Sequence, residues 1–216
     1  STPKPSSAAS DVYKRQVIIG YLQLIRLEKN VNEPVNSYIE HIEKKADYLK
    51  KLVDDLYLLF WSEAIESEVD MKSVNITEVV TSLLKEYIQN SKRASEQLDI
   101  RLPHGNIWIL DQEKILIRIL CNLIDNALKY STGDIMFYMW GESEYCHIQI
   151  SNPSDYISDE ELKSIFDLFY TKDEARIKSS GIGLYATRKL VIQISGDIQV
   201  NYEAGIFTVS IKLPLI

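Results

Sequence analysis

The hydrophobic positions in the first third of the chain repeat every three or four residues, which is the spacing of an amphipathic helix. They predict a helix remnant over 17–30 and, after a polar break at 30–34, a second helix over 35–60. The apolar seam of the second helix consists of Val35, Tyr38, Ile39, Ile42, Ala46, Leu49, Leu52, Val53, Leu56, Leu59 and Phe60. Because two helices joined by a short loop cannot bury both stripes against each other, we expect half of a four-helix bundle, completed by a second copy of the chain.

From residue 73 onward the pattern changes to short apolar strands that alternate with helices. Strands are predicted over 74–76, 98–102, 107–110, 135–140, 145–151, 198–202 and 206–213. Helices are predicted over 79–91, 112–130, 159–166 and 184–194. Thr77 is expected to cap the first of these helices. Strands with helices on one face predict an α+β fold, in which the helical hairpin is followed by a two-layer α/β sandwich.

The first sixteen residues are interpreted as a non-native leader. Ser6–Gln16 (SSAASDVYKRQ) resembles a translated sequencing-library adapter, and Ser1–Pro5 fits the primer sequence that precedes such an adapter. Residues encoded by an adapter are not part of the natural fold. We therefore expect the natural sequence to start at Val17. The expected organisation is a leader over 1–16, a truncated helical hairpin over 17–69 and a catalytic domain over 70–216.

Composition narrows the function classes. The 216 residues include 24 Lys and Arg against 31 Asp and Glu, a net charge of −7, which argues against a broad basic surface for nucleic acid. The cysteines and histidines show no metal-ligand spacing; they are Cys121, Cys146, His41, His104 and His147. No apolar run approaches the roughly 18 residues of a membrane-spanning helix. We expect no membrane contact in this piece and a cytoplasmic location.

The predicted helix over 112–130 ends in an unusual polar group, within NLIDNALKYS. Asn126 lies four residues after Asn122, where an apolar stripe favours a hydrophobic residue, and a buried amide costs free energy unless it has partners. Lys129 offers a point charge for phosphate, and Tyr130 offers a ring face for a purine. The group predicts a nucleotide site.

A glycine-rich turn opens the predicted helix over 184–194. In Ser180-Gly-Ile-Gly183-Leu184 the glycines allow backbone N–H groups and the helix N-terminus to approach a phosphate closely. A lone GxG is more often a turn, so this motif gains weight from the polar group on the preceding long helix.

Taken in order, NLxxNAxKYS, a strand ending in a polar loop, IFxxFY and SGIGLY resemble the N box, first glycine box, F box and second glycine box of sensor histidine kinases. The resemblance covers residues 73–213 and implies an ATP-binding domain of the Bergerat (GHKL) type. The upstream hairpin resembles the dimerisation and phosphotransfer domain of that family. It implies a homodimer formed through the helical bundle and a response regulator receiver domain as partner.

The resemblance also implies roles for single residues. Asn126 would coordinate Mg²⁺ with the help of Asn122, Lys129 would contact a phosphate, and Tyr130 would lie against the adenine. The segment 171–180 would be a lid over ATP, and Phe166 and Phe169 would be F-box aromatics, with plain core packing as the alternative. The full nucleotide site implied is Asn122, Asn126, Lys129, Tyr130, Asn152, Ile157, Phe169, Gly181, Ile182, Gly183 and Leu184.

The first glycine box departs from the family. Where the family has D-x-G-x-G, this chain has Asn152-Pro-Ser154-Asp-Tyr156-Ile157, and both glycines are lost. Asn152 keeps a carbonyl that accepts a hydrogen bond from the adenine amine, but it lacks the charge. Tyr156 adds bulk where backbone approaches the base in the family, which puts affinity in doubt. Asp155, shifted along the chain, is the alternative acceptor.

The phosphoacceptor histidine is also missing. Its counterpart would fall near Ala9, inside the leader, so no catalytic residue is assigned. His41 is interpreted as an ordinary surface histidine. The expected function is transfer of the γ-phosphoryl of ATP to a bundle histidine and then to an aspartate on the receiver domain. The alternatives are a degenerate kinase that acts as a nucleotide-binding or docking module, and another ATPase of the gyrase, chaperone and mismatch-repair group.

Overall fold

The computed structural model describes residues 35, 37–43, 46, 49, 53, 56, 60, 72–111, 113–171 and 180–216. The chain divides into two compact units, Ser1–Leu58 with Lys172–Ser180 and Leu59–Thr171 with Gly181–Ile216. The second unit contains all the strands of the described residues.

Two sheets form the second unit. Strands β2, β4, β5, β7 and β6 lie side by side in that order, and β1 pairs with β3 in a separate two-stranded sheet. Only β2 runs parallel to its neighbour β4; the other pairs are antiparallel. The strands are β1 Lys72–Asn75, β2 Leu98–Arg101, β3 Trp108–Asp111, β4 Ile135–Glu142, β5 Tyr145–Pro153, β6 Asp197–Glu203 and β7 Ile206–Pro214.

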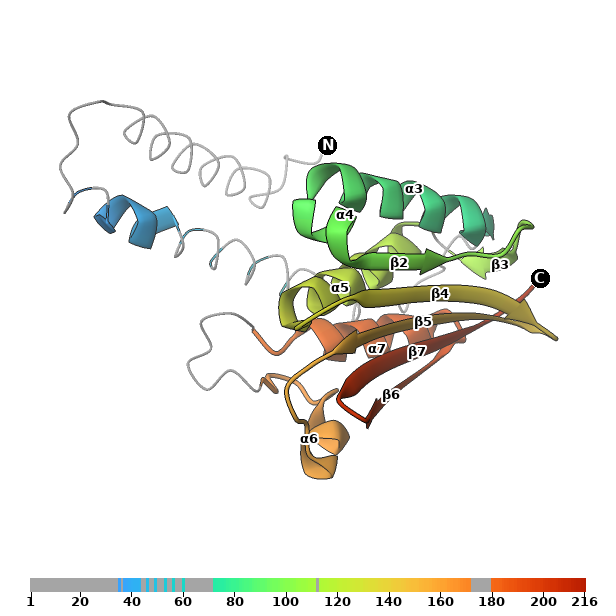
Figure 1. Cartoon of the computed structure of the whole chain (residues 1–216). Helices are drawn as coiled ribbons and strands as arrows, with labels where there is room; N and C mark the ends of the chain where they lie inside the picture. Colours follow the sequence, from blue (N-terminus) through green and yellow to red (C-terminus); the bar gives the residue numbers. More distant parts are fainter. Residues whose placement is uncertain are drawn as a thin grey trace, which may run out of the picture. The chain divides into compact units, whose positions relative to one another are not determined.

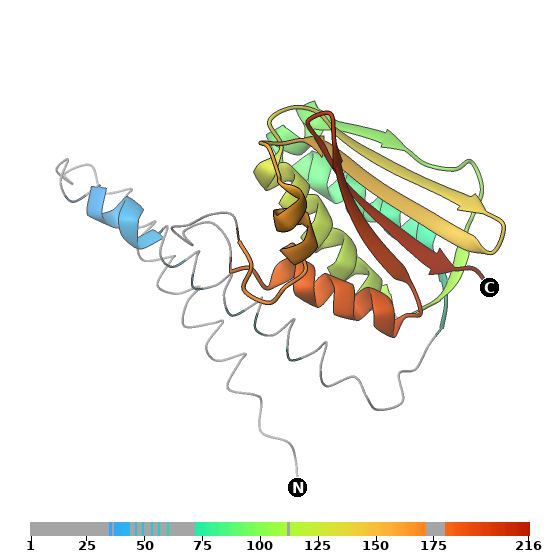
Figure 2. The ribbon, with the colours of Figure 1, turned by 90° about the horizontal axis from the view of Figure 1, so that it is seen from below.

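Helices cover one face of the five-stranded sheet. The helices are α3 Ile76–Asn90, α4 Lys92–Gln97, α5 Glu113–Tyr130, α6 Asp159–Ser164 and α7 Gly183–Gln193. In Figures 1 and 2, α3, α5 and α7 lie together on the same side of the sheet. This arrangement confirms the predicted α+β two-layer sandwich.

The core lies between these helices and the sheet. On β4, the alternating residues Ile135, Phe137 and Met139 are buried, as a strand with one covered face requires. On α5, every residue of the predicted apolar face is buried: Ile115, Ile119, Leu120, Leu123, Ile124 and Ala127. The polar residues of α5, from Glu113 and Lys114 at its start to Lys129 near its end, lie outside this buried face.

The start of α3 corrects one expectation. Asn75, not Thr77, occupies the N-cap position, and its side chain accepts a hydrogen bond from Glu78 N at 3.4 Å. The Thr77 hydroxyl instead donates to Gly105 O at 3.2 Å and accepts from Ile107 N at 3.0 Å. Thr77 therefore ties the β2–β3 loop to α3.

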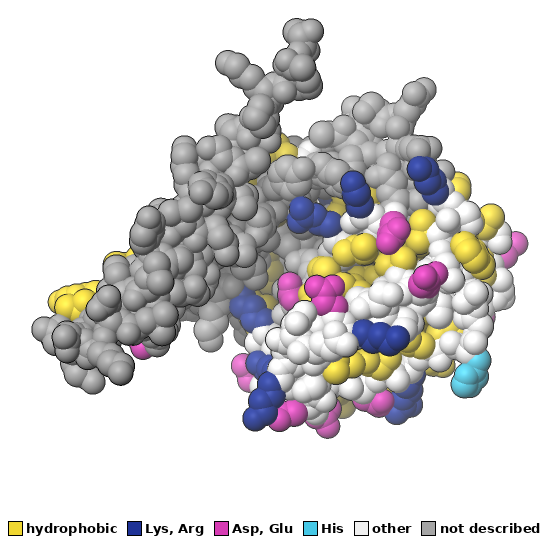
Figure 3. Space-filling model, turned by 90° about the horizontal axis from the view of Figure 1, so that it is seen from above, with side chains coloured by type: hydrophobic (Ala, Val, Ile, Leu, Met, Phe, Trp, Pro, Cys, Tyr) yellow, Lys and Arg dark blue, Asp and Glu magenta, His cyan; other side chains and the backbone are white. Residues whose placement is uncertain are grey.

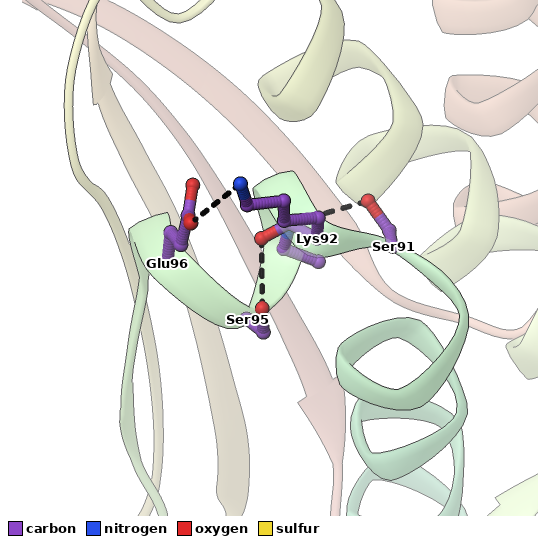
Figure 4. Close-up of polar contacts among 5 residues, drawn as sticks. Ser91, Lys92, Ser95 and Glu96 are labelled. Carbon is purple, nitrogen blue, oxygen red and sulfur yellow. Dashed lines mark hydrogen bonds and ion pairs between the residues drawn. The ribbon is translucent and has the colours of Figure 1, made fainter.

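Helix α4 was not expected from the sequence. Its short-range contacts appear in Figure 4: Ser91 Oγ accepts from Ala94 N at 3.2 Å, and Ser95 Oγ donates to Lys92 O at 2.7 Å. Lys92 and Glu96 form an ion pair of 3.6 Å one turn apart. These local bonds hold α4 as a separate turn between α3 and β2.

The surface of the described part carries both signs of charge. Figure 3 shows acidic and basic side chains interspersed with apolar ones on one face. Large apolar side chains on the surface of the second unit include Trp108, Leu110 and Tyr156, which are 46%, 51% and 72% exposed.

The described residues between 35 and 56 are helical, as predicted for the second hairpin helix. Ile39 is buried, whereas the seam residues Val35, Tyr38, Ile42, Leu49, Val53 and Leu56 are exposed. The leader over 1–16 and the helix predicted over 17–30 lie outside the described residues. Among the described residues, no helix is both long and apolar enough to cross a membrane.

Candidate functional site

The polar residues of α5 lie where this helix meets α7. Asn122 Nδ2 donates to Thr187 Oγ1 at 2.7 Å, and Thr187 is fully buried on α7. A Cβ added to Gly183 would lie 2.6 Å from Asn122 Oδ1. Only a glycine allows the start of α7 to approach this amide so closely. The structure thus brings the predicted N box and second glycine box together.

The other glycine of that box packs against the F box. Gly181 has φ +71°, and an added Cβ would lie 2.4 Å from the Phe169 carbonyl carbon. Phe169 itself has φ +67°, and its N–H donates to Gly181 O at 3.0 Å. The two segments are therefore in backbone contact, which fixes the chain as it enters α7.

Helix α7 starts without a polar cap side chain. Ile182 occupies its N-cap position, is buried, and makes no side-chain hydrogen bond to the first turn. Leu184 follows in that turn and is half-buried. Helix N-termini attract anions because their first N–H groups lack helical partners. The box residues Gly181–Leu184 thus place a helix N-terminus beside Asn122.

Asn126 lies one turn beyond Asn122 on α5. Its side chain is half-buried and makes no hydrogen bond within residues 72–111, 113–171 and 180–216. A half-buried amide without a partner loses solvation, which a ligand or ion would restore. The oxygen of this amide is the type of atom that binds Mg²⁺.

Lys129 and Tyr130 contact each other at the end of α5. Lys129 Nζ donates to Tyr130 Oη at 2.9 Å and lies 4.6 Å from the centre of that ring. Tyr130 is 42% exposed. The predicted phosphate-binding charge and the predicted aromatic surface are therefore adjacent and reachable from solvent.

Asn152 is buried at the end of β5. It is 4% exposed, and its Nδ2 donates to Pro153 O at 3.1 Å. Among the described residues, no donor reaches its Oδ1. Asp155, the alternative acceptor, is exposed in the following loop, and Ile157 is half-buried there. The burial of Asn152 favours it over Asp155 as the residue that would meet a base.

The residues that replace the two family glycines turn toward the β6–β7 hairpin. Ser154 N donates to Gly205 O at 3.1 Å, and Tyr156 meets Tyr202 edge-on, with the ring centres 6.1 Å apart. Tyr156 is 72% exposed. Its ring therefore lies beside the β6–β7 hairpin, and its effect on base binding stays a prediction.

The F-box aromatics are not simple core residues. Phe169 is 52% exposed, and Phe166 is half-buried with the Arg188 guanidinium 5.2 Å from its ring centre. The predicted lid over 171–180 lies mostly outside the described residues, because positions 172–179 are not described.

Four groups of the described part have raised pKa values. Burial raises the pKa of Cys146 to about 12 and also raises the pKa of Cys121. Burial and the nearby Asp125 carboxylate raise the pKa of Tyr87, whose hydroxyl donates to Asp125 Oδ1 at 2.8 Å. Desolvation and Glu161 raise the pKa of Tyr170. All four groups stay neutral at pH 7, so neither thiol is an activated nucleophile.

Sequence reasoning missed two residues that support this site. Thr187 is buried and polar on a mostly apolar helix face, the same signal that singled out Asn126. Arg93 donates from α4 to Ser131 O at 2.6 Å, just beyond Tyr130. Nothing in its local sequence pattern marks Arg93, because the contact joins elements 38 positions apart.

Sequence comparisons identify similar proteins. Residues 111–216 match the family described as histidine kinase-, DNA gyrase B- and HSP90-like ATPase. Sensor histidine kinase YcbM of Bacillus subtilis (strain 168) is 25% identical over 205 residues, which cover 91% of this chain and 66% of the relative. Sensor protein DltS of Streptococcus agalactiae serotype III (strain NEM316) is 26% identical, over 84% of this chain and 47% of the relative. The chain thus spans about half to two-thirds of these relatives.

Solved structures show the same fold. The Acinetobacter baumannii histidine kinase AdeS superposes with a TM-score of 0.65 at 19% identity, over 95% of this chain and 97% of that chain. Full-length ShkA in complex with AMPPNP superposes with a TM-score of 0.71 at 20% identity, over 96% of this chain and 45% of that chain.

Proposed function

We propose that residues 111–216, which match the family described as histidine kinase-, DNA gyrase B- and HSP90-like ATPase, bind Mg-ATP between α5 and α7 as the catalytic portion of a sensor histidine kinase. The contacts of Asn122 with Thr187 and Gly183 support this proposal most strongly. They place the polar residues of α5 beside the N-terminus of α7.

The residues fit the parts of the nucleotide. The Asn126 oxygen would bind Mg²⁺ together with phosphate oxygens, and Asn122, held by Thr187, would complete the polar side of the junction. The α7 N-terminus at Gly183 would face the phosphates. The Lys129 ammonium would supply positive charge there once it leaves the Tyr130 hydroxyl.

The base would be held near Tyr130, the last residue of α5. The Asn152 oxygen is buried and has no donor among the described residues. It would accept a hydrogen bond from the amino group of adenine. Tyr130 would offer its exposed ring to the base, and Ile157 and Phe169 would line the approach. Bound Mg-ATP would supply the phosphoryl group, while these residues would only bind and orient it.

The complete protein would act in a phosphorelay. The γ-phosphoryl group would pass to a histidine on the helical bundle and from there to an aspartate of a response regulator receiver domain. Dimerisation through the hairpin is supported by exposed apolar seam residues such as Tyr38 and Leu49. This portion would work in the cytoplasm, where ATP is available.

The degenerate docking module remains the second candidate, favoured by one observation. The first glycine box has lost both glycines, at Ser154 and Tyr156. The absence of nucleotide binding would select this candidate over the kinase.

The metal-ligand assignment predicts that Asn126→Ala lowers Mg-ATP affinity by more than about tenfold, because a metal ligand is removed. Thermal stability should change little, since the Asn126 amide makes no hydrogen bond within the described ranges. Titration with a fluorescent ATP analogue, with Mg²⁺ and with EDTA, measures both affinities. Asn201→Ala, at an exposed position of β6, is the matched control and should bind like wild type. Equal affinities for Asn126→Ala and wild type would refute the assignment.

A further inference from the structure

Arg93 connects α4 to the C-terminal end of α5. Its Nη2 donates to Ser131 O at 2.6 Å, and its Nε donates to Gln97 Oε1 at 2.7 Å. Ser131 directly follows Tyr130, the last residue of α5. A guanidinium at this end satisfies a terminal carbonyl with a charge-assisted hydrogen bond and complements the negative end of the helix dipole. Arg93 therefore fixes the point where α5 ends.

The turn after α5 is fastened on its other side to β5. Ser131 Oγ donates to Gly133 O at 2.6 Å and accepts from Gly133 N at 3.1 Å, which closes the turn on itself. Thr132 N donates to Pro153 O at 3.0 Å. The turn therefore connects Arg93, which binds Ser131 O, to the end of β5 at Pro153.

Pro153 O also orients the Asn152 amide. It accepts from Asn152 Nδ2 at 3.1 Å as well as from Thr132 N. A carbonyl oxygen only accepts, so the amide must present its NH₂ to Pro153 and keep Oδ1 as the acceptor. The Pro153 carbonyl therefore accepts hydrogen bonds from both the turn after α5 and the Asn152 amide, and so orients the buried Asn152 oxygen.

We infer that Arg93 is a positioning residue for base recognition, acting through Ser131, Thr132 and Pro153 on Asn152. The inference rests on the proposed nucleotide site. The oriented Asn152 oxygen selects a purine with an amino group at the contact position. A purine with an oxo group there would place two acceptors against each other.

Removing the Arg93 side chain leaves α4 with its own local bonds. The Ser91 cap, the Ser95 hydroxyl and the Lys92–Glu96 ion pair involve other side chains (Figure 4). Arg93→Ala therefore tests the connection to α5 rather than the existence of α4.

The test compares ATP with inosine triphosphate, which has an oxo group in place of the adenine amino group. Calorimetric titration in Mg²⁺ should give wild type a preference for ATP of about tenfold or more. Arg93→Ala should weaken ATP binding by about three- to tenfold and leave inosine triphosphate nearly unchanged, so the preference falls. Arg93→Lys, which keeps the charge, should retain most of it. Arg101→Ala removes an exposed arginine paired with Asp99 on β2 and should match wild type.

Other outcomes overturn the inference. If Arg93→Ala weakens both nucleotides equally, its role is only structural; if the preference stays intact, Arg93 does not position the base site. Gln97→Ala removes the Arg93 Nε partner more mildly and should lower the preference in the same direction even if Arg93→Ala does not fold. Wild type that binds neither nucleotide would refute the proposed function itself. Wild type that binds both equally would refute base selection by Asn152 while leaving phosphate binding in place.

Discussion

The two segments that match glycine boxes differ in how closely they pack. At Gly181, an added Cβ would lie 2.4 Å from the backbone of Phe169, and at Gly183 it would lie 2.6 Å from the Asn122 amide. In the first box, Ser154 and Tyr156 stand at the glycine positions, and the chain there bonds to Gly205 and meets Tyr202 without such contacts.

This difference shows that a lost glycine matters only where other atoms occupy the place of a side chain. The second box needs its glycines because backbone and a polar side chain press against them. In the first box, Ser154 and Tyr156 contact the β6–β7 hairpin through Gly205 and Tyr202. We therefore expect the altered first box to allow nucleotide binding, and we expect substitutions at Gly181 and Gly183 to be the costly ones.

The largest expected effect is at Gly181. Gly181→Ala should lower the free energy of unfolding by about 2–4 kcal/mol, because a left-handed φ and a backbone clash act together. Urea denaturation measures the loss, and ATP affinity should fall with it. Gly105→Ala is the control, since nothing lies within 4 Å of its added Cβ, and should change stability little. Equal stabilities for the two variants would contradict the close packing assigned to Gly181.

A smaller effect is expected from restoring the family's acidic residue. Asn152→Asp should lower stability at pH 7 by about 1–3 kcal/mol, because a carboxylate would replace the NH₂ that donates to Pro153 O. The folded state would raise the pKa of this Asp, so the loss should shrink as pH falls toward its ordinary value of about 4 and grow as pH rises. Thermal melts from pH 4 to 8 give the profile, with Asn201→Asp as the exposed control. A stability gain at pH 7 would contradict the orientation assigned to Asn152.

The smallest effect is expected at Tyr156. Tyr156→Gly should change stability by less than about 1 kcal/mol and ATP affinity by less than about twofold, because the side chain is 72% exposed and its ring meets Tyr202 edge-on. Titration with a fluorescent ATP analogue checks the affinity. A tenfold gain in affinity would mean that Tyr156 obstructs the base after all, and that the first box is the impaired one.

Much of the fold could be predicted from periodicity alone. The sequence predicts the bounds of β4, β5 and α5 within two residues, as strands over 135–140 and 145–151 and a helix over 112–130. Each of these elements has one covered face, which leaves a regular apolar period in the sequence. Helix α4 was missed, since a six-residue helix held by a Ser cap and polar pairs carries no apolar period. Hydroxyl side chains often cap helices, which favours Thr77 from the sequence, yet Asn75 caps α3 and Thr77 binds the β2–β3 loop.

The candidate site was predictable where its residues follow one another along a helix or turn. Asn122, Asn126 and Lys129 follow helical spacing, and Gly181 and Gly183 form one turn. Their partners could not be predicted, because contacts such as Asn122 with Thr187 or Arg93 with Ser131 depend on how distant elements pack. The direction of the Asn152 amide depends on Pro153 O, a backbone atom that no sequence pattern reveals.

The central claim is that the α5–α7 junction forms a working nucleotide site although the acceptor histidine is absent from its expected position. Phosphoryl transfer requires an acceptor held in line with the γ-phosphate, so this chain should bind ATP without labelling itself. His41 is exposed, and its Nδ1 hydrogen bonds to Ser37 O at 3.1 Å.

The most direct measurement is incubation with γ-labelled ATP and Mg²⁺, with and without a supplied bundle domain that carries the histidine. We predict acid-labile, base-stable label on the supplied bundle and none on this chain. Label on His41 would contradict the assignment of that residue as an ordinary surface histidine. No transfer to the supplied bundle would contradict the claim of a working site and favour the docking module.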